Sequence, residues 1–580
     1  RPPLPQPLAG RGGAGGWSAG PPPPPAPSGD GGRYEDLFSP GQSLDASGVL
    51  DLVSPARSYD EAGGRAILSP NISCNLISGA IIASLPEPAM LPPPQADEDF
   101  SLPESSPMYH HLQSIPHRRV SADTGAGQQL RLKLLRGSVI VFISAGYSGK
   151  RFIYEAAASL GVYVVLLDGP DSWSRALVDE GVVQKFVPID MSEAETVFER
   201  CLDAIRALDS DDDLPGGVSG VCSFCELAIP LVSRLATALG LPSNPPAAVD
   251  AARDKHEARR AIEAAGLPSV AHAMVEGEGD IAAAAEKVGF PAVIKPVSGA
   301  ASLGVMRANN EGELREAFHK VQAEMRGLVV SSGALVKAAD AEGASVSFKV
   351  SLMVEEYLDG DEVDIDLVLS EGTAVYAAIT DNWPCIEPWF NETGSNCPSL
   401  LPSGKQAEVV DLAVRSCAAL GLRMGVFHVE AKYTSHGPRL IEINCRMGGG
   451  PVRDVNLMVW GVDLVQEHLL ATVGIPLRPQ KAPRPRKHIG EYSINAARSG
   501  YMSRIDFLDP WQRRGDVIQA IPLVRAWEAV VGPQDGLPTW ICELIVEGET
   551  VERAIELLLE IERSIEQPIV DDLPLAGAGA

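Results

Sequence analysis

The sequence contains a pair of acidic side chains whose spacing suits the binding of a cation. Glu430 and Glu442 lie in two extended stretches on either side of a polar turn at 434–438, which contains Ser, His, Gly and Pro. If this hairpin closes symmetrically, Glu430 lies directly across from Glu442. Two like charges at facing positions destabilise a hairpin unless something cationic lies between them. The pairing therefore predicts a cation at this point of the hairpin.

Alternation of side chains along the second strand adds a third donor to the pair. Asn444 and Arg446 share the face of Glu442, because successive side chains on a strand point to opposite sides. Two carboxylates and an amide oxygen are hard ligands that suit Mg²⁺, which keeps its other positions for water and phosphate oxygens. The alternative is a solvated hairpin face on which Glu442 pairs with Arg446 or Lys432.

Two lysines earlier in the chain are candidate phosphate contacts. Lys295 ends an apolar strand at 290–297, and Lys255 lies near the start of a helix. An ammonium group is a point charge well suited to phosphate oxygens. A lysine at a strand end is, however, more often simply solvated.

A glycine-rich loop at 298–304 follows Lys295. Its small residues, the hydroxyls of Ser298 and Ser302, and the backbone amides up to Gly304 could fold over phosphate groups. Because glycine-rich loops are common, this signal is weak by itself, and its position after Lys295 gives it weight.

The stretch 352–369 has features that an adenosine would need. Its first strand ends near Leu358 at an Asp-Gly turn, and Glu362 then lies on one face with two aspartates. Free backbone groups at a strand end can bind an adenine edge, and an isolated acid beside them can bind a ribose diol. The local alternative is a polar strand face without a ligand.

Taken in their order along the chain, these motifs resemble the ATP-grasp superfamily. The resemblance is carried by the two lysines, the glycine-rich loop, EEYLDGDE at 355–362 and the E-I-N-x-R motif at 442–446. RLIEINCRMGG at 439–449 and the stretch 452–465 are most similar to the carnosine synthases and related amino-acid ligases, and FNETGSNCPSLLP at 390–402 fits that group. The resemblance covers about residues 138–570.

The resemblance implies roles for individual residues in binding ATP. Lys255 and Lys295 would contact the phosphates, with loop 298–304 as a flexible lid over them. The adenine hinge would consist of Glu355 and of the backbone from Glu356 to Leu358. Glu362 would hold the ribose.

The resemblance also implies a metal site and substrate contacts. The donors expected to hold two Mg²⁺ ions, with Mn²⁺ as a possible substitute, are Glu430, Glu442 and Asn444. Arg446 would lie beside the transferring phosphoryl group, Arg453 would clamp a substrate carboxylate, and Glu392 would contact a substrate amine. Cys445 and the segment 449–451 depart from the family pattern, which leaves the identity of the substrates open.

Periodicity predicts an α/β fold in several parts. Buried strands at 138–146, 162–168 and 218–222 alternate with helices and predict a Rossmann-like, doubly wound domain over 137–250. The resemblance implies a two-lobed ATP-grasp domain of α+β type over 251–480, and a C-terminal α+β subdomain with a disordered tail over 481–580. Residues 1–136 are rich in Gly, Pro and Ser-Pro steps and are expected to be disordered.

The catalytic part has a simple expected order of elements. The expected helices lie at 254–267, 311–326, 405–420 and 549–565, and the expected further strands lie at 346–356, 362–369, 374–380 and 540–548. The stretch 328–345 is expected to be a mobile loop.

Two further motifs resemble known ligand sites but lack residues that those sites need. SAGYSGKR at 144–151 lacks the four residues between glycines, and the Ser/Thr after lysine, that a phosphate-cradling loop needs. It therefore predicts a strand-to-helix turn. Cys222 and Cys225 form a lone C-x-x-C without a second pair, so two small buried residues explain them better than a zinc site.

Composition narrows the class of partner. The chain has 580 residues and a formal net charge of −28, which is unfavourable for binding a nucleic acid backbone. No stretch approaches the roughly 18–20 apolar residues of a membrane helix, and the nine cysteines are scattered, which favours a reducing compartment. We therefore expect a cytoplasmic protein, although the start at Arg1 leaves organellar targeting open. A homodimer is an expectation from the resemblance.

The expected function is an ADP-forming ligase that joins two small amino acids through an acyl phosphate. The specific pair that the resemblance supports is β-alanine and L-histidine. Three alternatives stay open: an ATP-grasp ligase with another acyl donor, a bicarbonate-activating carboxylase, and a nucleotide-binding module without catalysis. No biotin attachment motif is visible, which disfavours the carboxylase.

Overall fold

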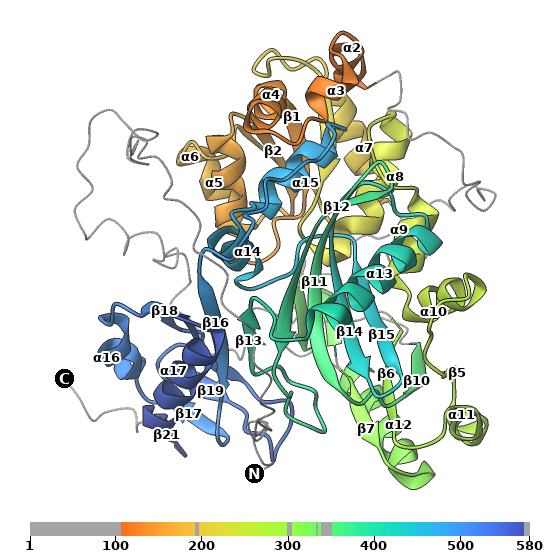
Figure 1. The fold of residues 1–580 in the computed structure, drawn as a ribbon, viewed down its shortest axis with the longest axis vertical. Coiled ribbons are helices and arrows are strands. Elements are labelled where there is room, and N and C mark those ends of the chain that lie inside the picture. The colour runs from red at the N-terminus through yellow and green to blue at the C-terminus, as the bar shows by residue number, and fades with distance from the viewer. Residues whose placement is uncertain are drawn as a thin grey trace, which may run out of the picture. The chain divides into compact units, whose positions relative to one another are not determined.

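The computed structural model describes residues 106–191, 196–297, 304–326, 328–331, 334–337 and 351–572 (Figure 1). The disorder expected for 1–105 and for the tail from 573 lies outside the described residues, as does most of the predicted lid at 298–304. Within the described part of the chain, no helix combines the length and the apolar character that crossing a membrane requires.

The prediction of disorder is wrong for residues 106–136, which form three helices. These are α2 (Pro107–Gln113), α3 (His117–Val120) and α4 (Gly125–Leu135). Val120 and Leu135 are buried in the same core as the first strand. The Arg131 side chain is also buried and donates hydrogen bonds to the carbonyls of Val120 at 2.8 Å and Arg478 at 2.7 Å. A long-range contact of this kind leaves no local signal in the sequence.

The N-terminal domain is doubly wound, as predicted. Its parallel sheet has the order β3-β2-β1-β4. The strands are β1 (Val139–Ile143), β2 (Tyr163–Asp168), β3 (Lys185–Pro188) and β4 (Val218–Cys222), and the helices are α5 (Arg151–Ser159), α6 (Ala176–Asp179), α7 (Val197–Leu208) and α8 (Ile229–Leu239). Alternate residues of β1 enter two different cores, so helices cover both faces of the sheet.

The stretch 144–151 and the pair Cys222 and Cys225 both have the structures that the sequence predicts for them. A short turn of helix at Ser148–Lys150 leads from β1 into α5, as expected of a strand-to-helix turn. Cys222 and Cys225 are small buried residues.

A small antiparallel sheet of order β5-β10-β6-β7 follows. Its strands are β5 (His272–Val275), β6 (Ala292–Pro296), β7 (Met306–Ala308) and β10 (Leu352–Glu356), and its helices are α11 (Ile281–Val288) and α12 (Glu311–Arg326). The prediction of a loop over 328–345 is wrong for its first part, where β8 (Leu328–Ser331) and β9 (Ala334–Lys337) pair as an antiparallel hairpin. Residues 338–345 lie outside the described part.

The second sheet of the catalytic part has eight strands in the order β15-β14-β11-β12-β13-β16-β20-β18. Its first five are β15 (Gly437–Asn444), β14 (Gly425–Thr434), β11 (Asp361–Ser370), β12 (Thr373–Asn382) and β13 (Gly394–Cys397). The helix α13 (Ser403–Leu420) covers one face at β11 and β14 (Figure 1), where Ile365 and Val429 pack against it. The acidic residues of β11 and β14 are therefore on the opposite face.

The hairpin register confirms the predicted pairing of Glu430 with Glu442. His428 lies across from Asn444, but the register shifts after Glu430, and Ala431 faces Leu440. Ile441 is thus the extra residue of a β-bulge. Such a bulge frees a carbonyl from the ladder, and the Ile441 carbonyl accepts a hydrogen bond from Arg259 at 2.8 Å.

The remaining elements connect the domains and complete the large sheet. The helices α9 (Pro246–Arg253) and α10 (Lys255–Ala264) precede the small sheet, and α14 (Val452–Trp460) and α15 (Leu464–Thr472) follow the hairpin. The C-terminal elements are β16 (His488–Asn495), β17 (Gly500–Met502), α16 (Asp509–Gln512), β18 (Val517–Pro522), β19 (Ala529–Val530), β20 (Trp540–Gly548), α17 (Val551–Ser564) and β21 (Ile569–Val570). α17 packs on β16 and β20 (Figure 1).

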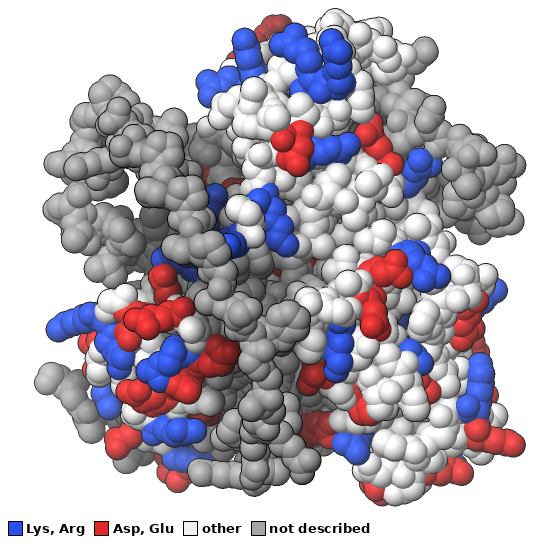
Figure 2. Space-filling view, in the orientation of Figure 1, with Lys and Arg blue, Asp and Glu red and all other residues white. Residues whose placement is uncertain are grey.

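Charges of both signs are interspersed on the surface. On the face drawn in Figure 2, Lys and Arg side chains lie among Asp and Glu side chains over most of the described area. This distribution agrees with a composition of 76 acidic and 48 basic residues.

Candidate functional site

The two facing glutamates of the hairpin have opposite electrostatic environments. The Lys255 Nζ forms an ion pair with Glu442 Oε2 at 2.5 Å, and the Asn444 amide donates to Glu442 Oε1 at 2.9 Å. Burial opposes ionisation of Glu442, but the charge of Lys255 and these hydrogen bonds hold the pKa of its carboxyl at about 2. The partner of Glu442 is thus Lys255, and neither Arg446 nor Lys432 takes that place.

Among the described residues, no lysine or arginine forms an ion pair with Glu430. Burial, followed by the negative charges of Glu442, Asp364 and Glu392, raises the pKa of Glu430 well above its usual value. The nearest basic group that forms an ion pair with it is His428 Nε2, at 4.0 Å. Negative charge is therefore in excess on this side of the hairpin.

The excess extends onto the neighbouring strand and a loop. Asp364 of β11 lies across from Glu430, and burial raises its pKa to about 6. Glu392 is an exposed residue, yet desolvation by the surrounding protein atoms and the charges of Asp364 and Glu362 raise the pKa of its carboxyl to about 7. The structure thus brings Glu392 beside the hairpin acids, as a shared site requires.

His428 lies under this acidic cluster and was not a predicted site residue. Its Nδ1 is 3.0 Å from Asp366 Oδ1, and the amide of Asn456 donates to Asp366 Oδ2 at 2.6 Å. Burial alone would lower the pKa of His428, but the charges of Asp364 and Asp366 raise it to about 9. A Cβ on Gly448 would lie 2.7 Å from the imidazole, which explains a glycine at this position after the hairpin.

The donor set of the hairpin fits a divalent cation. Among the described residues, no group of three or more His, Cys, Asp or Glu side chains is arranged around one point as metal ligands. The predicted set is of another kind, since it combines Glu430 and Glu442 with the amide of Asn444. The negative charge that raises the pKa of Glu430 is the charge that a bound cation would neutralise.

Lys295 is not a solvated strand end. Its side chain is buried and forms an ion pair with Glu355 Oε2, and burial lowers the pKa of its ammonium group. Arg259 donates to the same carboxylate, at 2.9 Å to Oε1 and 3.3 Å to Oε2. Burial opposes ionisation of Glu355, but these two cations hold its pKa at about 2. Sequence reasoning missed Arg259, because nothing near it in the chain indicates a partner.

The predicted adenine hinge lies where the small sheet ends. The Glu356 N–H donates to the Ala271 carbonyl at 2.9 Å and the Tyr357 N–H to the Pro291 carbonyl at 3.0 Å. The Leu358 carbonyl accepts a bond from Lys432 Nζ at 3.5 Å. Lys432 is also 3.3 Å from Glu362, the predicted ribose contact. The hinge backbone is thus held in place, with a lysine and a carboxylate beside it.

The lid is described only at its end. Ser298 and Ser302 lie outside the described residues. Gly304 is buried with φ +73°, and a Cβ there would be 3.1 Å from the ring of Pro296. The left-handed conformation and the close packing both favour glycine.

Arg446 is held by three partners. Its Nε forms an ion pair with Glu226 Oε2 at 2.6 Å, its Nη1 donates to the Met447 carbonyl at 2.9 Å, and its Nη2 donates to Asn444 Oδ1 at 3.5 Å. The contact to Asn444 places Arg446 beside the hairpin donors. Glu226 belongs to the N-terminal domain and was missed by sequence reasoning.

Arg453 is engaged elsewhere. Its Nε and Nη2 donate to the two oxygens of Asp463 at 2.9 Å and 2.6 Å, and its guanidinium carbon lies 5.4 Å from the ring centroid of Phe152. Asp463 caps the N-terminus of α15. The described contacts of Arg453 thus include none with the hairpin acids, and a substrate carboxylate would have to compete with Asp463.

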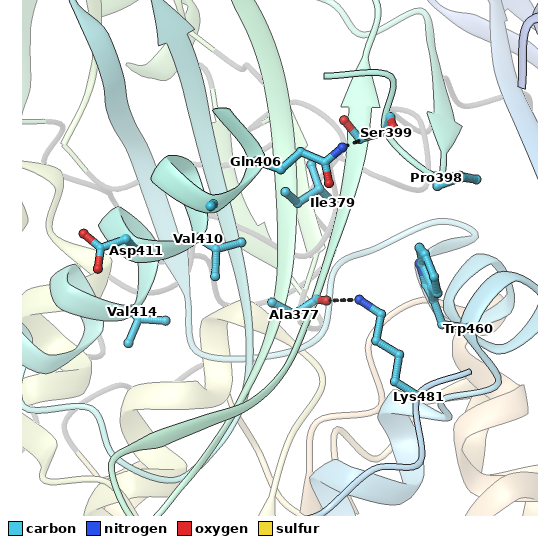
Figure 3. A pocket seen from close by; sticks show the side chains of 11 residues that line it. Ala377, Ile379, Pro398, Ser399, Gln406, Val410, Asp411, Val414, Trp460 and Lys481 are labelled. Carbon is cyan, nitrogen blue, oxygen red and sulfur yellow. Dashed lines mark hydrogen bonds between the residues drawn. The ribbon is translucent and has the colours of Figure 1, made fainter. Parts of the chain in front are cut away.

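A separate cavity of about 670 Å³ shares no residue with this site. Figure 3 shows its lining, in which Lys481 donates to the Ala377 carbonyl at 2.6 Å beside Trp460. Ile379 lines this cavity and faces Ile365 across the strands, so the cavity is on the α13 side of the large sheet. The acidic cluster is on the other side.

Comparison with known families agrees with the geometry. Residues 154–243 match the model of the ATP-grasp N-terminal domain, and residues 288–454 match the model of the ATP-grasp domain. A crystal structure of an L-amino acid ligase from Bacillus licheniformis has a TM-score of 0.61 at 22% identity, over 76% of this chain and all of that one. The predicted fold class is therefore confirmed.

Two curated relatives are similar to this chain in sequence. Carnosine synthase 1 of Gallus gallus is 34% identical over 402 residues, which are 66% of this chain and 40% of that protein. Alanine–anticapsin ligase of Bacillus subtilis is 27% identical over 263 residues, which are 43% of this chain and 53% of that protein. The chain spans less than half the length of the carnosine synthases that it matches, between 40% and 46%.

Proposed function

We propose that this chain, which contains an ATP-grasp N-terminal domain and an ATP-grasp domain, is an ADP-forming ligase that joins a carboxylate to the amine of an amino acid. The observation that carries the proposal is the arrangement of Glu430 opposite Glu442 in the ladder, with Lys255 and Arg446 in contact with the same donor set. An excess of acidic side chains with cationic side chains beside them suits the binding of a nucleotide whose phosphates carry a metal ion.

The chemistry requires activation of the carboxylate. A carboxylate and an amine at neutral pH form a salt, because the carboxylate is a poor electrophile. Transfer of the γ-phosphoryl group of ATP to the carboxylate oxygen releases ADP and gives an acyl phosphate. The amine then attacks the acyl carbon, loses a proton, and inorganic phosphate leaves as the amide forms.

The cationic side chains of the site would have different roles in these reaction steps. Crowding ATP against a carboxylate brings like charges together, so positive charge is needed where negative charge accumulates. Lys255 and Lys295 would hold the phosphates, and the planar fork of Arg446 would meet the transferring group with two N–H donors. Glu355 and Arg259 keep Lys295 oriented.

Glu430, Glu442 and Asn444 would hold Mg²⁺, and a bound ion would supply positive charge between these acids and the phosphate oxygens. The excess of negative charge around Glu430 and Asp364 supports this assignment. Two ions, and Mn²⁺ as a substitute, belong to the same proposal.

The substrates that we propose are small amino acids, with β-alanine and L-histidine as the specific pair. The likeness to carnosine synthases supports this choice. Glu392 lies beside the acidic cluster and would accept a bond from a substrate amine. Arg453 would clamp the substrate carboxylate only by exchanging Asp463 for it.

Measurement of ADP release against a panel of acid and amine pairs tests the function. We expect release that requires both an amino-acid carboxylate and an amine, and a dipeptide in amounts equal to the ADP. Release that requires bicarbonate would instead indicate a carboxylase. Nucleotide binding without release for any pair would indicate a module without catalysis and would contradict the proposal.

A further inference from the structure

We propose that Glu226, a residue of the N-terminal domain, is a positioning residue that fixes Arg446 in the orientation needed at the transferring phosphoryl group. This inference rests on the proposed function, because it concerns the same site. It adds a residue that lies outside every motif of the ATP-grasp resemblance.

The position of Glu226 follows from the fold of its domain. β4 ends at Cys222, and a short turn leads into the helical turn Glu226–Ala228. In open α/β sheets, ligands bind beyond the carboxyl ends of the strands. Glu226 stands at this edge with 3% of its surface exposed, so its charge is committed to protein partners.

Those partners are two arginines from different segments. Glu226 Oε2 forms the ion pair with Arg446 Nε at 2.6 Å, while Glu226 Oε1 accepts a bond from Arg253 Nη1 at 2.7 Å. Arg253 Nη1 also donates to the Glu226 backbone carbonyl at 2.7 Å. The carboxylate therefore cannot rotate without breaking contacts to α9 as well as to the end of the hairpin.

The contacts of Arg446 leave a defined part of its guanidinium for a ligand. A guanidinium has five N–H groups. Glu226 Oε2 forms an ion pair beside Nε, the Met447 carbonyl accepts one hydrogen bond from Nη1, and Asn444 Oδ1 accepts one from Nη2. In the bonds described for Arg446, one donor on each terminal nitrogen stays available, and two such donors form the fork that binds two phosphoryl oxygens.

The second arginine explains how a carboxylate can hold Arg446 without cancelling its charge. Glu226 carries one negative charge between Arg253 and Arg446, so the group of three keeps one net positive charge. The Arg253 and Glu226 side chains are only 3% and 4% exposed, so this charge is poorly screened by water. The arrangement orients Arg446 and leaves a positive field for a phosphoryl group.

A purely structural role for Glu226 predicts different behaviour, and the chain offers a matched control. Arg234 of α8 and Asp250 of α9 form a bidentate pair at 2.9 Å and 2.5 Å, between the same domain and the same helix. Asp250 contacts none of the site residues in the bonds described for it. Asp250→Asn therefore measures what loss of an interhelical ion pair does to the fold.

The test uses binding of ADP with magnesium and fluoroaluminate, a mimic of the transferring phosphoryl group, measured by calorimetry beside ADP with magnesium alone. Glu226→Gln keeps the side-chain size but removes the charge. We expect it to weaken binding of the mimic about 30-fold, which is less than the roughly 100-fold or more that outright loss of a transition-state donor costs, and to change ADP affinity less than about threefold. Asp250→Asn should change neither.

A second experiment, in a protein that lacks the Arg446 side chain, tests whether Glu226 acts through Arg446. In an Arg446→Ala protein, Glu226→Gln should weaken the mimic less than about twofold further, because residues that act through one another are not additive. Glu226→Asp keeps the charge one methylene away, so it should retain the melting temperature and lose about threefold to tenfold.

Equal losses for the mimic and ADP, or an additive loss in the Arg446→Ala background, would overturn the inference. If Glu226→Gln does not fold, the same two outcomes are read from Glu226→Asp. This binding test needs no amino-acid substrate, so it distinguishes a failure of the Glu226 role from a failure of the proposed ligase, which would appear as absent ADP release.

Discussion

Two groups of carboxylates in this molecule have opposite electrostatic environments. Glu355 and Glu226 each lie between two cationic side chains, Lys295 with Arg259 and Arg253 with Arg446. Glu430, Asp364 and Glu392 lie together with fewer cations than acids around them. The compensated carboxylates hold the cationic side chains beside them, and we propose that the uncompensated ones receive a divalent cation.

Glu442 marks the boundary between the two groups. It faces Glu430 in the ladder, yet its pKa is near 2 because Lys255 is beside it. One pair of neighbouring positions thus contains both kinds of environment. The excess charge on the uncompensated side has a cost in stability, which the ligand-free protein must carry and which ligand binding would remove.

The largest effect that we expect is a loss of stability when a compensated carboxylate is removed. Glu355→Ala leaves Lys295 and Arg259 buried without their common partner, and the loss of one member of a buried ion pair costs about 3–5 kcal/mol of unfolding free energy. Urea unfolding of the ligand-free protein measures it. Asp411→Asn, which affects an exposed pair with Arg415 on α13, is the control and should change stability by less than about 0.5 kcal/mol.

The next effect concerns the boundary residue. Glu442→Ala should lower the turnover for ADP release at least about 100-fold, because it removes a metal ligand and the partner of Lys255. This loss corresponds to about 2.7 kcal/mol in the barrier. A turnover within a few-fold of the unaltered protein would contradict the metal assignment, and Asp411→Asn again serves as the control.

The uncompensated side predicts a pH dependence of stability in the ligand-free protein. The folded-state pKa values of Asp364 and Glu392 are raised to about 6 and about 7, so their favourable contribution is present below the unfolded value near 4 and is lost as the pH rises through 6 and 7. The melting temperature should therefore fall between pH 5 and pH 8. Glu392→Gln should flatten this fall, and an unchanged slope would place Glu392 outside the cluster.

Glu355 predicts the opposite sign at a lower pH. Because its folded-state pKa is lowered to about 2, its contribution is present above the unfolded value near 4.5 and is lost as the pH falls toward 2. Comparison of the unaltered protein with Glu355→Gln between pH 2 and pH 5 measures this difference. A stability difference that grew as the pH fell would contradict the environment of Glu355.

The smallest expected effect is at Arg453. Arg453→Ala loses the pair with Asp463 at the N-terminus of α15 and should cost about 1 kcal/mol of unfolding free energy. If Arg453 also clamps a substrate carboxylate, the KM of the acid rises while nucleotide affinity stays the same. An unchanged KM leaves it with the structural role alone.

The sequence predicted those parts of the site that depend on local alternation. The β-bulge at Ile441 sets Glu430 opposite Glu442, since the register next to the turn would pair Glu430 with Ile441. The shared face of His428 and Glu430 on β14 follows from the two-residue period of a strand. The helices α10, α12, α13 and α17 lie within a few residues of their predicted positions for the same reason, since their apolar periodicity is strong. By contrast, β3 was missed because it is short and only half-buried.

What the sequence did not predict depends on partners far apart in the chain. Nothing near Arg259 indicates its partner Glu355, which lies far along the chain, and nothing near Glu226 indicates an arginine from another domain. The helices at 106–136 were missed because their composition resembles that of a linker, while their burial comes from contacts with β1 and with the segment near Arg478. Such contacts are visible only once the fold has brought these segments together.

The central claim is that the uncompensated acids receive a divalent cation together with a nucleotide. Calorimetry of a non-hydrolysable ATP analogue, with and without Mg²⁺ and in two buffers of different ionisation enthalpy, tests it most directly. We predict affinity that requires Mg²⁺ and proton release at pH 7, because carboxyls with raised pKa values must ionise to bind a metal, and a loss of both in Glu430→Gln. Affinity that is the same without Mg²⁺, or in Glu430→Gln, would contradict the account.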